Sequence, residues 1–286
     1  MYNIKIITNF YSPMEGYTMK WKTMMTACLA GILAVSVLAG CGSEKKDDAK
    51  KPLRVATNAT FVPFEFKEND QSKEYQGFEM DLLRAIAKEM GRDVEINNIA
   101  FSGIIPILQQ GDMDIAAAGM TVTKERAQKV NFSAPFYESK LVVLTPNDSG
   151  IDSADAIAGK QVAVQIGTTG AQYAENQGYT VKQFDNNSDV IMELQVGGSP
   201  AAILDKPVAD YFLTQDGKGK FKVIDIPNTK SEYLAFAFNK KDTELMNQVN
   251  DAMAKLKEKG EFQKLYKKWF NTDMPDLPKS GEDALK

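Results

Sequence analysis

The sequence contains no histidine and only two cysteines among its 286 residues. Without histidine, the chain has no imidazole for a catalytic triad and no imidazole ligand for a metal. Cys28 and Cys41 both lie near the N-terminus, so the remaining chain has no thiol nucleophile and forms no internal disulfide. We therefore expect neither a metal nor a cofactor.

Positive charge is also limited. The 34 Lys and Arg residues face 38 Asp and Glu residues, which gives a formal net charge of -4. They form no basic block, so the composition argues against a nucleic-acid partner. Arginine itself is scarce, and the chain has only Arg54, Arg84, Arg92 and Arg126. An arginine that lies next to a ligand-binding pattern is therefore a candidate ligand contact.

Arg126 follows such a pattern. Residues 115–118 form a short apolar run that predicts a buried parallel strand. Gly119 then lets the backbone turn, and Thr121 offers a hydroxyl at the carboxyl end of the strand, where open α/β sheets bind ligands. The Arg126 guanidinium is a planar fork that matches a carboxylate. The alternative is a solvent-exposed arginine just after a strand.

Hydrophobic periodicity predicts an α/β fold. Residues 53–118 read as strand, helix, strand, helix, strand, with strands at 53–57, 94–98 and 114–118 and helices at 79–90 and 101–110. A further strand is predicted at 140–145 and a turn at 146–150, after which the pattern restarts. The strands after the turn are predicted at 161–164, 181–184, 201–204, 223–226 and 233–238. The helices are predicted at 153–157, 189–196, 208–214, 243–259 and 262–270. A further helix ends at Asn176, and we expect a loose tail after Pro275. Two α/β units in succession predict two lobes.

The N-terminus reads as a targeting segment. Lys20 and Lys22 precede the apolar residues 24–37, which are too few to span a bilayer. Residues 38–41, Leu-Ala-Gly-Cys, resemble the bacterial lipoprotein signal, which implies cleavage before Cys41 and a lipid on its sulfur. An ordinary membrane anchor is the alternative. Residues 1–18 lack a signal pattern, so Met19 is a candidate initiator. The polar residues 41–52 then form a tether that holds the body outside the membrane.

Four motifs in order carry a family resemblance. They are Gly-Phe-Glu-Met-Asp-Leu-Leu at 77–83, Phe-Ser-Gly-Ile-Ile-Pro at 101–106, Thr-Val-Thr-Lys-Glu-Arg at 121–126 and Tyr-Lys-Lys-Trp-Phe at 266–270. The chain from 53 to 271 resembles the family 3 solute-binding proteins, the polar amino-acid-binding proteins of ABC importers. It is most similar to the glutamine-binding members.

The resemblance implies the two-lobed periplasmic-binding-protein fold of type II, with a wound, mostly parallel sheet in each lobe. Residues 53–139 and 235–275 would form the first lobe, 140–234 the second and 276–286 a tail. Two crossing strands, near 140–145 and 228–235, would join the lobes and let them close on a ligand. It also implies an extracytoplasmic monomer that delivers a small amino acid to a membrane-embedded ABC permease, with no enzymatic activity.

The resemblance also assigns the groups that hold the amino-acid backbone. Arg126, Thr121 and the Gly119 backbone match the grip on the α-carboxylate, and Thr169 matches a second-lobe backbone contact to it. Asp205 matches the acid that binds the α-ammonium. From the residues alone, Asp205 follows an apolar strand and faces the crevice, but it could equally be a helix N-cap before a proline.

The side-chain pocket is less certain from sequence. Phe61 and Phe101 match aromatics that enclose the ligand side chain, although either could be a core residue. Asn58 stands where basic and glutamine binders of the family commonly have Asp, Gln165 where the glutamine binder has Lys, and Leu204 where it has His. These neutral residues predict a neutral polar ligand, glutamine first.

Other readings stay open at this point. A basic amino acid is the alternative ligand, because Glu65 or Glu79 could reach the pocket. Family relatives include dehydratases acting on cyclic acids, so an enzyme on the same scaffold is a second hypothesis. A sensory domain is the third.

Overall fold

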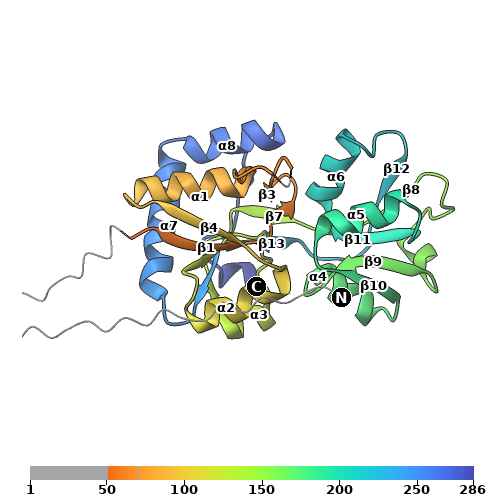
Figure 1. Cartoon of the computed structure of the whole chain (residues 1–286), viewed down its shortest axis with the longest axis horizontal. Coiled ribbons are helices and arrows are strands. Elements are labelled where there is room, and N and C mark those ends of the chain that lie inside the picture. The colour runs from red at the N-terminus through yellow and green to blue at the C-terminus, as the bar shows by residue number, and fades with distance from the viewer. Residues whose placement is uncertain (1–50, 70) are drawn as a thin grey trace, which may run out of the picture. The chain divides into compact units, whose positions relative to one another are not determined.

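The computed structural model describes residues 51–69 and 71–286, and within them the chain is an α/β protein, as predicted. The described residues form two five-stranded sheets and two two-stranded sheets. Figure 1 shows each large sheet with helices on both of its faces. The targeting segment and most of the predicted tether lie outside the described residues.

The first sheet has the strand order β4-β1-β5-β14-β6. Its strands are β4 (Val94–Asn98), β1 (Leu53–Thr57), β5 (Ile115–Ala116), β14 (Ala237–Asn239) and β6 (Val130–Phe132). β1 runs parallel to β4 and β5, as the alternating pattern predicts, whereas β14 runs antiparallel to β5 and β6. Because β14 comes from the C-terminal part of the chain, the backbone returns to this sheet near its end.

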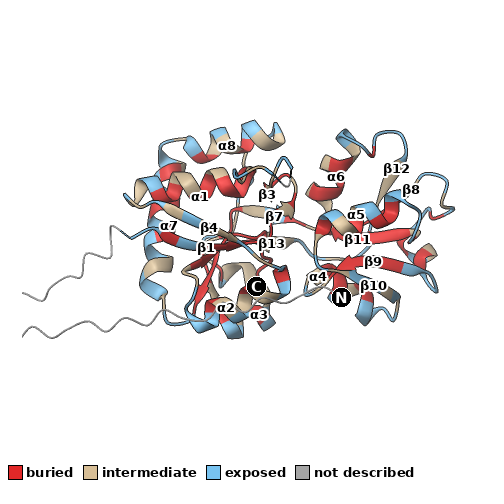
Figure 2. Ribbon diagram, in the orientation of Figure 1, coloured by how far each residue is buried: buried red, intermediate tan, exposed pale blue. Residues whose placement is uncertain are grey.

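Helices cover both faces of the first sheet. α1 (Phe78–Glu89), α7 (Thr243–Glu258) and α8 (Glu261–Phe270) share one buried apolar cluster with it, and η2 (Phe101–Gly103) and α2 (Ile104–Gln110) share another. Figure 2 shows the buried strands between these helices. The sheet therefore forms the rigid middle layer on which the ends of β1 and β5 are fixed.

The second sheet has the order β10-β9-β11-β8-β12. Its strands are β10 (Thr180–Phe184), β9 (Gln161–Gln165), β11 (Ala201–Asp205), β8 (Leu141–Pro146) and β12 (Phe221–Asp225). β9 is parallel to β10 and β11, and β8 is antiparallel to β11 and β12. α5 (Asn187–Gln195) and α6 (Lys206–Thr214) pack on one face, and η3 (Ala154–Ile157) and α4 (Thr169–Asn176) on the other.

A pair of short strands connects the two α/β layers, which we call the first and second lobe. β7 (Tyr137–Ser139) and β13 (Glu232–Leu234) pair antiparallel in a two-stranded sheet of their own. The prediction of a crossing strand at 140–145 is wrong, because that segment is β8 inside the second sheet. The predicted strand 233–238 is in fact two strands, β13 and β14. The proposed lobe boundaries stay predictions.

Three further regions of the chain contain elements that were not predicted or were predicted wrongly. α3 (Lys124–Lys129) is a short polar helix, and β6 follows it directly. The tail is not loose: η4 (Asp283–Leu285) packs Ala284 and Leu285 against the first lobe, and a Cβ at Gly281 would meet Phe132 at 2.7 Å. β2 (Thr60–Phe61) and β3 (Glu65–Phe66) form a small hairpin after β1.

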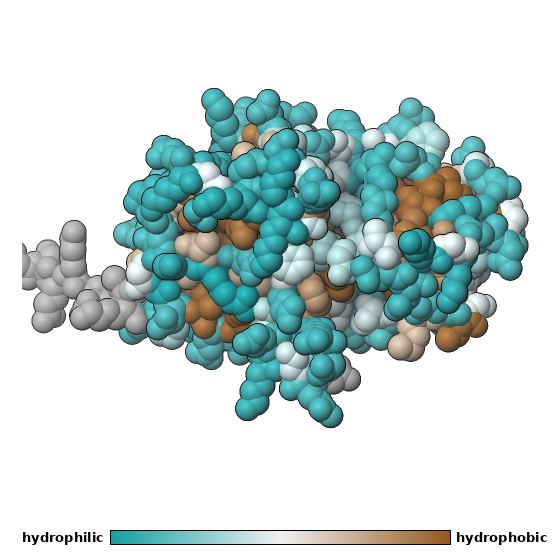
Figure 3. Space-filling model, turned by 90° about the horizontal axis from the view of Figure 1, so that it is seen from above, coloured by the Kyte–Doolittle hydropathy of each residue, from teal (hydrophilic) through white to brown (hydrophobic). Residues whose placement is uncertain are grey.

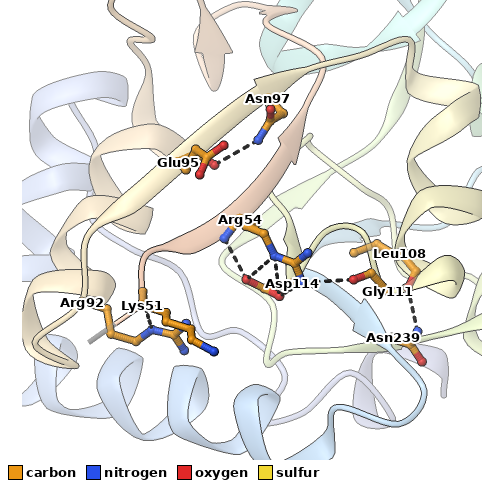
Figure 4. A network of polar contacts seen from close by, with 9 residues as sticks. All are labelled: Lys51, Arg54, Arg92, Glu95, Asn97, Leu108, Gly111, Asp114 and Asn239. Atoms are coloured by element: carbon orange, nitrogen blue, oxygen red, sulfur yellow. Dashed lines mark hydrogen bonds and ion pairs between the residues drawn. The ribbon is translucent and has the colours of Figure 1, made fainter. Parts of the chain in front are cut away.

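The other three arginines make structural contacts. Figure 4 shows Arg54 on β1 paired with Asp114, at 2.5 Å between Nη2 and Oδ1, and Arg92 donating to the Lys51 carbonyl at 2.9 Å. Arg84 donates to the Tyr75 carbonyl at 2.6 Å. These contacts tie strand ends and loops of the first lobe together, and they leave Arg126 as the arginine available to a ligand site.

Hydrophilic side chains cover most of the face seen in Figure 3, with small hydrophobic groups between them. In the part of the chain that the structure describes, no helix has the length and apolar character needed to cross a membrane.

Candidate functional site

The carboxyl ends of strands from both large sheets meet around one small cavity. All nine predicted ligand-binding residues line it: Asn58, Phe61, Phe101, Gly119, Thr121, Arg126, Gln165, Thr169 and Asp205. The cavity has a volume of about 20 Å³. That is room for roughly one water molecule. An amino acid can therefore enter only if the lobes separate.

Arg126 is held where the two lobes meet. It lies on α3, which begins at the N-cap Thr123, whose hydroxyl accepts the Arg126 amide at 3.1 Å. Its guanidinium donates from Nη1 to the Thr121 carbonyl and from Nη2 to the Gly167 carbonyl, both at 2.9 Å. It also lies 5.3 Å from the centre of the Phe101 ring. Burial lowers the pKa of Arg126 from its usual value, and the charges of Glu232 and Asp205 oppose that effect.

Gly119 is required at its position in the turn after β5. Its φ is +54°, and a Cβ there would meet the Phe61 ring at 2.5 Å. Only glycine adopts this conformation without strain and leaves that space to the ring. The Gly119 amide donates to Glu79 Oε2 at 2.7 Å, so a buried carboxylate on α1 supports the turn from behind.

Glu79 forms a buried pair with Glu65, and both carboxyl groups are inaccessible to solvent. Burial, together with the charge of Glu79, raises the pKa of Glu65 well above its usual value. Burial raises the pKa of Glu79 to about 7, although hydrogen bonds from Glu65 and Gly119 oppose the rise. Apart from the contact between the two carboxyl groups, both Glu65 oxygens and Glu79 Oε1 lack a hydrogen-bond partner among the described residues.

Asp205 ends β11 and precedes α6, but its side chain makes no capping hydrogen bond to the helix. Its Oδ1 accepts the Ser139 hydroxyl at 2.7 Å. Burial raises the pKa of Asp205 to about 7, and the charge of Glu232 adds to this, whereas Ser139 and Arg126 oppose it. The geometry therefore favours the crevice-facing acid over the helix cap.

Three side-chain amides from the two lobes are hydrogen-bonded to one another. We call these residues, Asn58, Gln165 and Asn187, the amide clasp. Gln165 Nε2 donates to Asn58 Oδ1 at 2.9 Å, and Asn187 Nδ2 donates to Gln165 Oε1 at 2.6 Å. Asn58 Nδ2 also donates to the Ile99 carbonyl at 3.0 Å and to Asn186 Oδ1 at 3.2 Å. Asn58 therefore has no free amide hydrogen, and Gln165 gives its second one to the Asp185 carbonyl at 2.8 Å.

The second lobe also contributes the start of a helix. Thr168 caps α4 by accepting the Ala171 amide at 3.1 Å, and Thr169 is the first residue of that helix. The first amides of a helix have no partner within it and suit an anion. Thr169 thus offers a backbone donor as well as a hydroxyl.

Four lining residues were not among the predicted ligand contacts: Glu65, Ala118, Thr168 and Asn187. Sequence analysis also missed Glu232, whose Oε2 accepts the Thr169 hydroxyl at 2.8 Å and the Thr121 hydroxyl at 3.3 Å. Its only sequence signal was a position inside a predicted crossing segment. Among the described residues, no group of three or more His, Cys, Asp or Glu side chains could hold a metal ion.

Comparisons with known proteins agree with this architecture. The family model of bacterial extracellular solute-binding proteins, family 3, matches residues 53–272. The arginine-binding extracellular protein ArtP of Bacillus subtilis (strain 168) is 34% identical over 259 residues, which cover 88% of this chain and 98% of that protein. A probable histidine-binding protein of Neisseria gonorrhoeae is 33% identical over 260 residues, covering 88% and 95%.

Several solved structures are also similar to the chain, both in sequence and in fold. An ancestral arginine-binding protein bound to glutamine is 38% identical with a TM-score of 0.71, covering 78% of this chain and 99% of that one. An ancestral arginine-binding protein bound to arginine gives 38% identity and a TM-score of 0.70, covering 78% of this chain and 98% of that one. AncCDT-1, an ancestral amino acid-binding protein and a precursor of cyclohexadienyl dehydratase, gives 38% and 0.71, covering 78% and 96%.

The family match spans both large sheets and the crossing strands, and the neighbouring structures share the type II fold that the sequence predicted. The chain belongs to family 3 of the bacterial extracellular solute-binding proteins.

Proposed function

We propose that the protein binds a polar amino acid between its lobes and delivers it to an ABC-type permease. The observation that carries the proposal is that two residues of opposite charge line the same cavity. Arg126 from the first lobe and Asp205 from the second both line it. A free amino acid carries the complementary carboxylate and ammonium. A ligand that contacts both residues stabilises the closed form, because it interacts with both lobes only when they meet.

Contacts between the lobes give the closed form a defined geometry. Arg126 donates to the Gly167 carbonyl, and the amide clasp joins Asn58 to Gln165. The Gly119 amide donates to Glu79 Oε2 and is not free for a ligand, whereas Thr169 offers a backbone amide in the first turn of α4. We infer that the α-carboxylate lies between Arg126 and the first turn of α4, and that the α-ammonium lies at Asp205.

For the ligand side chain, the amide clasp weakens the argument for a neutral ligand. That argument depended on Asn58 and Gln165 being free to pair with a ligand amide, and in the closed form their hydrogen atoms are donated to protein groups. Glu65 lines the same cavity, is fully buried and has oxygens without a donor. A buried carboxyl pair is stabilised by a nearby cation.

We therefore propose a basic amino acid, namely arginine, lysine or histidine, as the preferred ligand. The relatives named as arginine-binding and histidine-binding agree with this choice. Glutamine is the second candidate, because Gln165 Oε1 keeps one free lone pair and ancestral arginine-binding proteins were solved bound to glutamine and to arginine. An enzyme is not favoured: the relatives are named as binding proteins, and the cavity acids have assigned roles in binding.

Replacing Arg126 tests the function itself. We expect Arg126→Ala to weaken amino-acid binding about 30- to 4,000-fold, since removing one partner of a buried charge pair costs about 2–5 kcal/mol. Arg126→Lys should also weaken it, because one ammonium cannot reproduce the fork. Isothermal titration calorimetry measures both, with Arg92→Ala as a control that keeps the wild-type Kd. An Arg126→Ala protein within threefold of wild type would remove Arg126 from the site.

A thermal-shift panel of the twenty amino acids tests the ligand class. We expect the basic amino acids to raise Tm most and glutamine less, because the shift follows RT ln(1 + [L]/Kd). Glu65→Gln keeps the size of the side chain and removes its charge, so this variant should lose the preference for basic ligands and still bind glutamine. A larger shift with glutamine than with every basic amino acid would restore the neutral-pocket hypothesis.

The same panel has a pH signature. The raised pKa values of Glu65, Glu79 and Asp205 mean that these groups hold protons near neutral pH in the free protein. A bound cation favours the ionised carboxylate, so protons are released on binding and affinity rises with pH. All amino acids should bind more tightly from pH 6 to 8 as Asp205 ionises, and the ratio of arginine to glutamine affinity should rise as well.

We also propose that a lipid on Cys41 anchors the protein at the outer side of the cell membrane, with residues 41–52 as the tether. The support is the Leu-Ala-Gly-Cys sequence at 38–41 after a short apolar segment. Cys41→Ala should abolish incorporation of a labelled fatty acid in cells and block processing of the precursor. Cys28→Ala is the matched control and should label normally. Continued labelling of the Cys41→Ala protein would disprove the assignment.

A further inference from the structure

We propose that Glu232, on the crossing strand β13, occupies the carboxylate subsite and competes with the ligand for it. This inference rests on the proposed function of the cavity. Glu232 Oε2 accepts the Thr169 hydroxyl at 2.8 Å and the Thr121 hydroxyl at 3.3 Å. The two threonines come from different lobes. Thr121 is a predicted contact of the α-carboxylate, and Thr169 is predicted to contact it through the backbone. A protein carboxylate thus occupies the hydroxyl groups of both residues.

The competition follows from the single hydrogen atom that each threonine hydroxyl can donate. A threonine hydroxyl has one hydrogen to donate and can still accept bonds from other groups. When Thr121 and Thr169 donate to Glu232, neither can donate to a ligand carboxylate, which only accepts. The ligand must then either displace Glu232 or rely on Arg126 and the backbone amides alone. Both routes lower its affinity.

Charge adds to the competition. Two charged or titratable groups from other elements interact with Glu232: Arg126 on α3 and Asp205 on β11. Arg126 attracts Glu232, and the charge of Glu232 in turn disfavours a second carboxylate beside the same guanidinium. Burial raises the pKa of Glu232, while Thr169, Arg126 and Thr121 oppose the rise. Protonation of Glu232 would therefore remove the competing charge.

The crossing strands connect this residue to the other anchor. Glu232 on β13 pairs in register with Ser139 on β7, and the Ser139 hydroxyl donates to Asp205. The two paired residues thus contact the two halves of the predicted ligand site, Glu232 at the carboxylate end and Ser139 at the ammonium end. Glu232 is therefore placed to hold the lobes together until a ligand carboxylate takes over its hydroxyl contacts.

Glu232→Gln tests the inference, because it keeps an acceptor of similar size and removes the charge. Calorimetry with L-arginine and L-glutamine at pH 5.5, 7.0 and 8.5 gives the ratio of wild-type to variant Kd. We expect the variant to bind about five- to tenfold more tightly at pH 8.5. The gain should be smaller at lower pH, because burial raises the pKa of Glu232 and favours its protonated form. The ratio removes the titration of Glu65 and Glu79, which both proteins share, whereas Asp205 feels the charge of Glu232 and is part of the measured effect.

Glu138→Gln is the matched control, because Glu138 is an exposed carboxylate on the paired strand β7, and it should leave Kd unchanged. Glu232→Ala, which removes the acceptor as well, should also bind more tightly. Weaker binding by both Glu232 variants would overturn the inference and make Glu232 a ligand contact. A wild-type protein that binds none of the twenty amino acids would instead refute the proposed function.

Discussion

The site depends on one buried positive charge. Arg126 contacts both lobes, because its guanidinium donates to the Thr121 carbonyl of the first lobe and to the Gly167 carbonyl of the second. A buried guanidinium cannot lose its proton, so it needs anions around it. Glu232, Asp205 and, in our account, the carboxylate of an amino acid provide them. The positions of the other residues in the cavity follow from this requirement.

The fold brings these anions to Arg126 from distant parts of the chain. Two sheets direct the carboxyl ends of β5, β9 and β11 toward one cavity, and the β7–β13 pair adds Glu232 and Ser139 from the connection between them. Contacts such as the amide clasp are possible only when the lobes meet. In our account binding and closure are parts of one equilibrium, and the small volume of the cavity agrees with a ligand that enters when the lobes are apart.

Much of this arrangement was predictable from sequence because its signals are local. The apolar run before Gly119, the position of Arg126 after it and the end of β11 at Asp205 identify strand ends, and the family motifs placed the two lobes. Glu65 was considered only as an acid that could reach the pocket. Glu232 was missed because its contacts to Thr169 and Thr121 span 63 and 111 residues, and nothing in its neighbouring residues predicts them. Asn187 was missed because its role depends on a side-chain contact to Gln165, 22 residues away. For the same reason, Asn58 and Gln165 appeared free to bind a ligand.

The central claim is that Arg126 and its neighbours recognise the carboxylate of a free amino acid. The most direct test removes that carboxylate from the ligand rather than changing the protein. Calorimetry should compare L-arginine with agmatine, which is arginine without its carboxylate, and include L-glutamine as a second carboxylate ligand. Our account predicts that agmatine binds at least about 30-fold more weakly than L-arginine, since it leaves the buried guanidinium without its partner. Equal affinities for agmatine and L-arginine would contradict it.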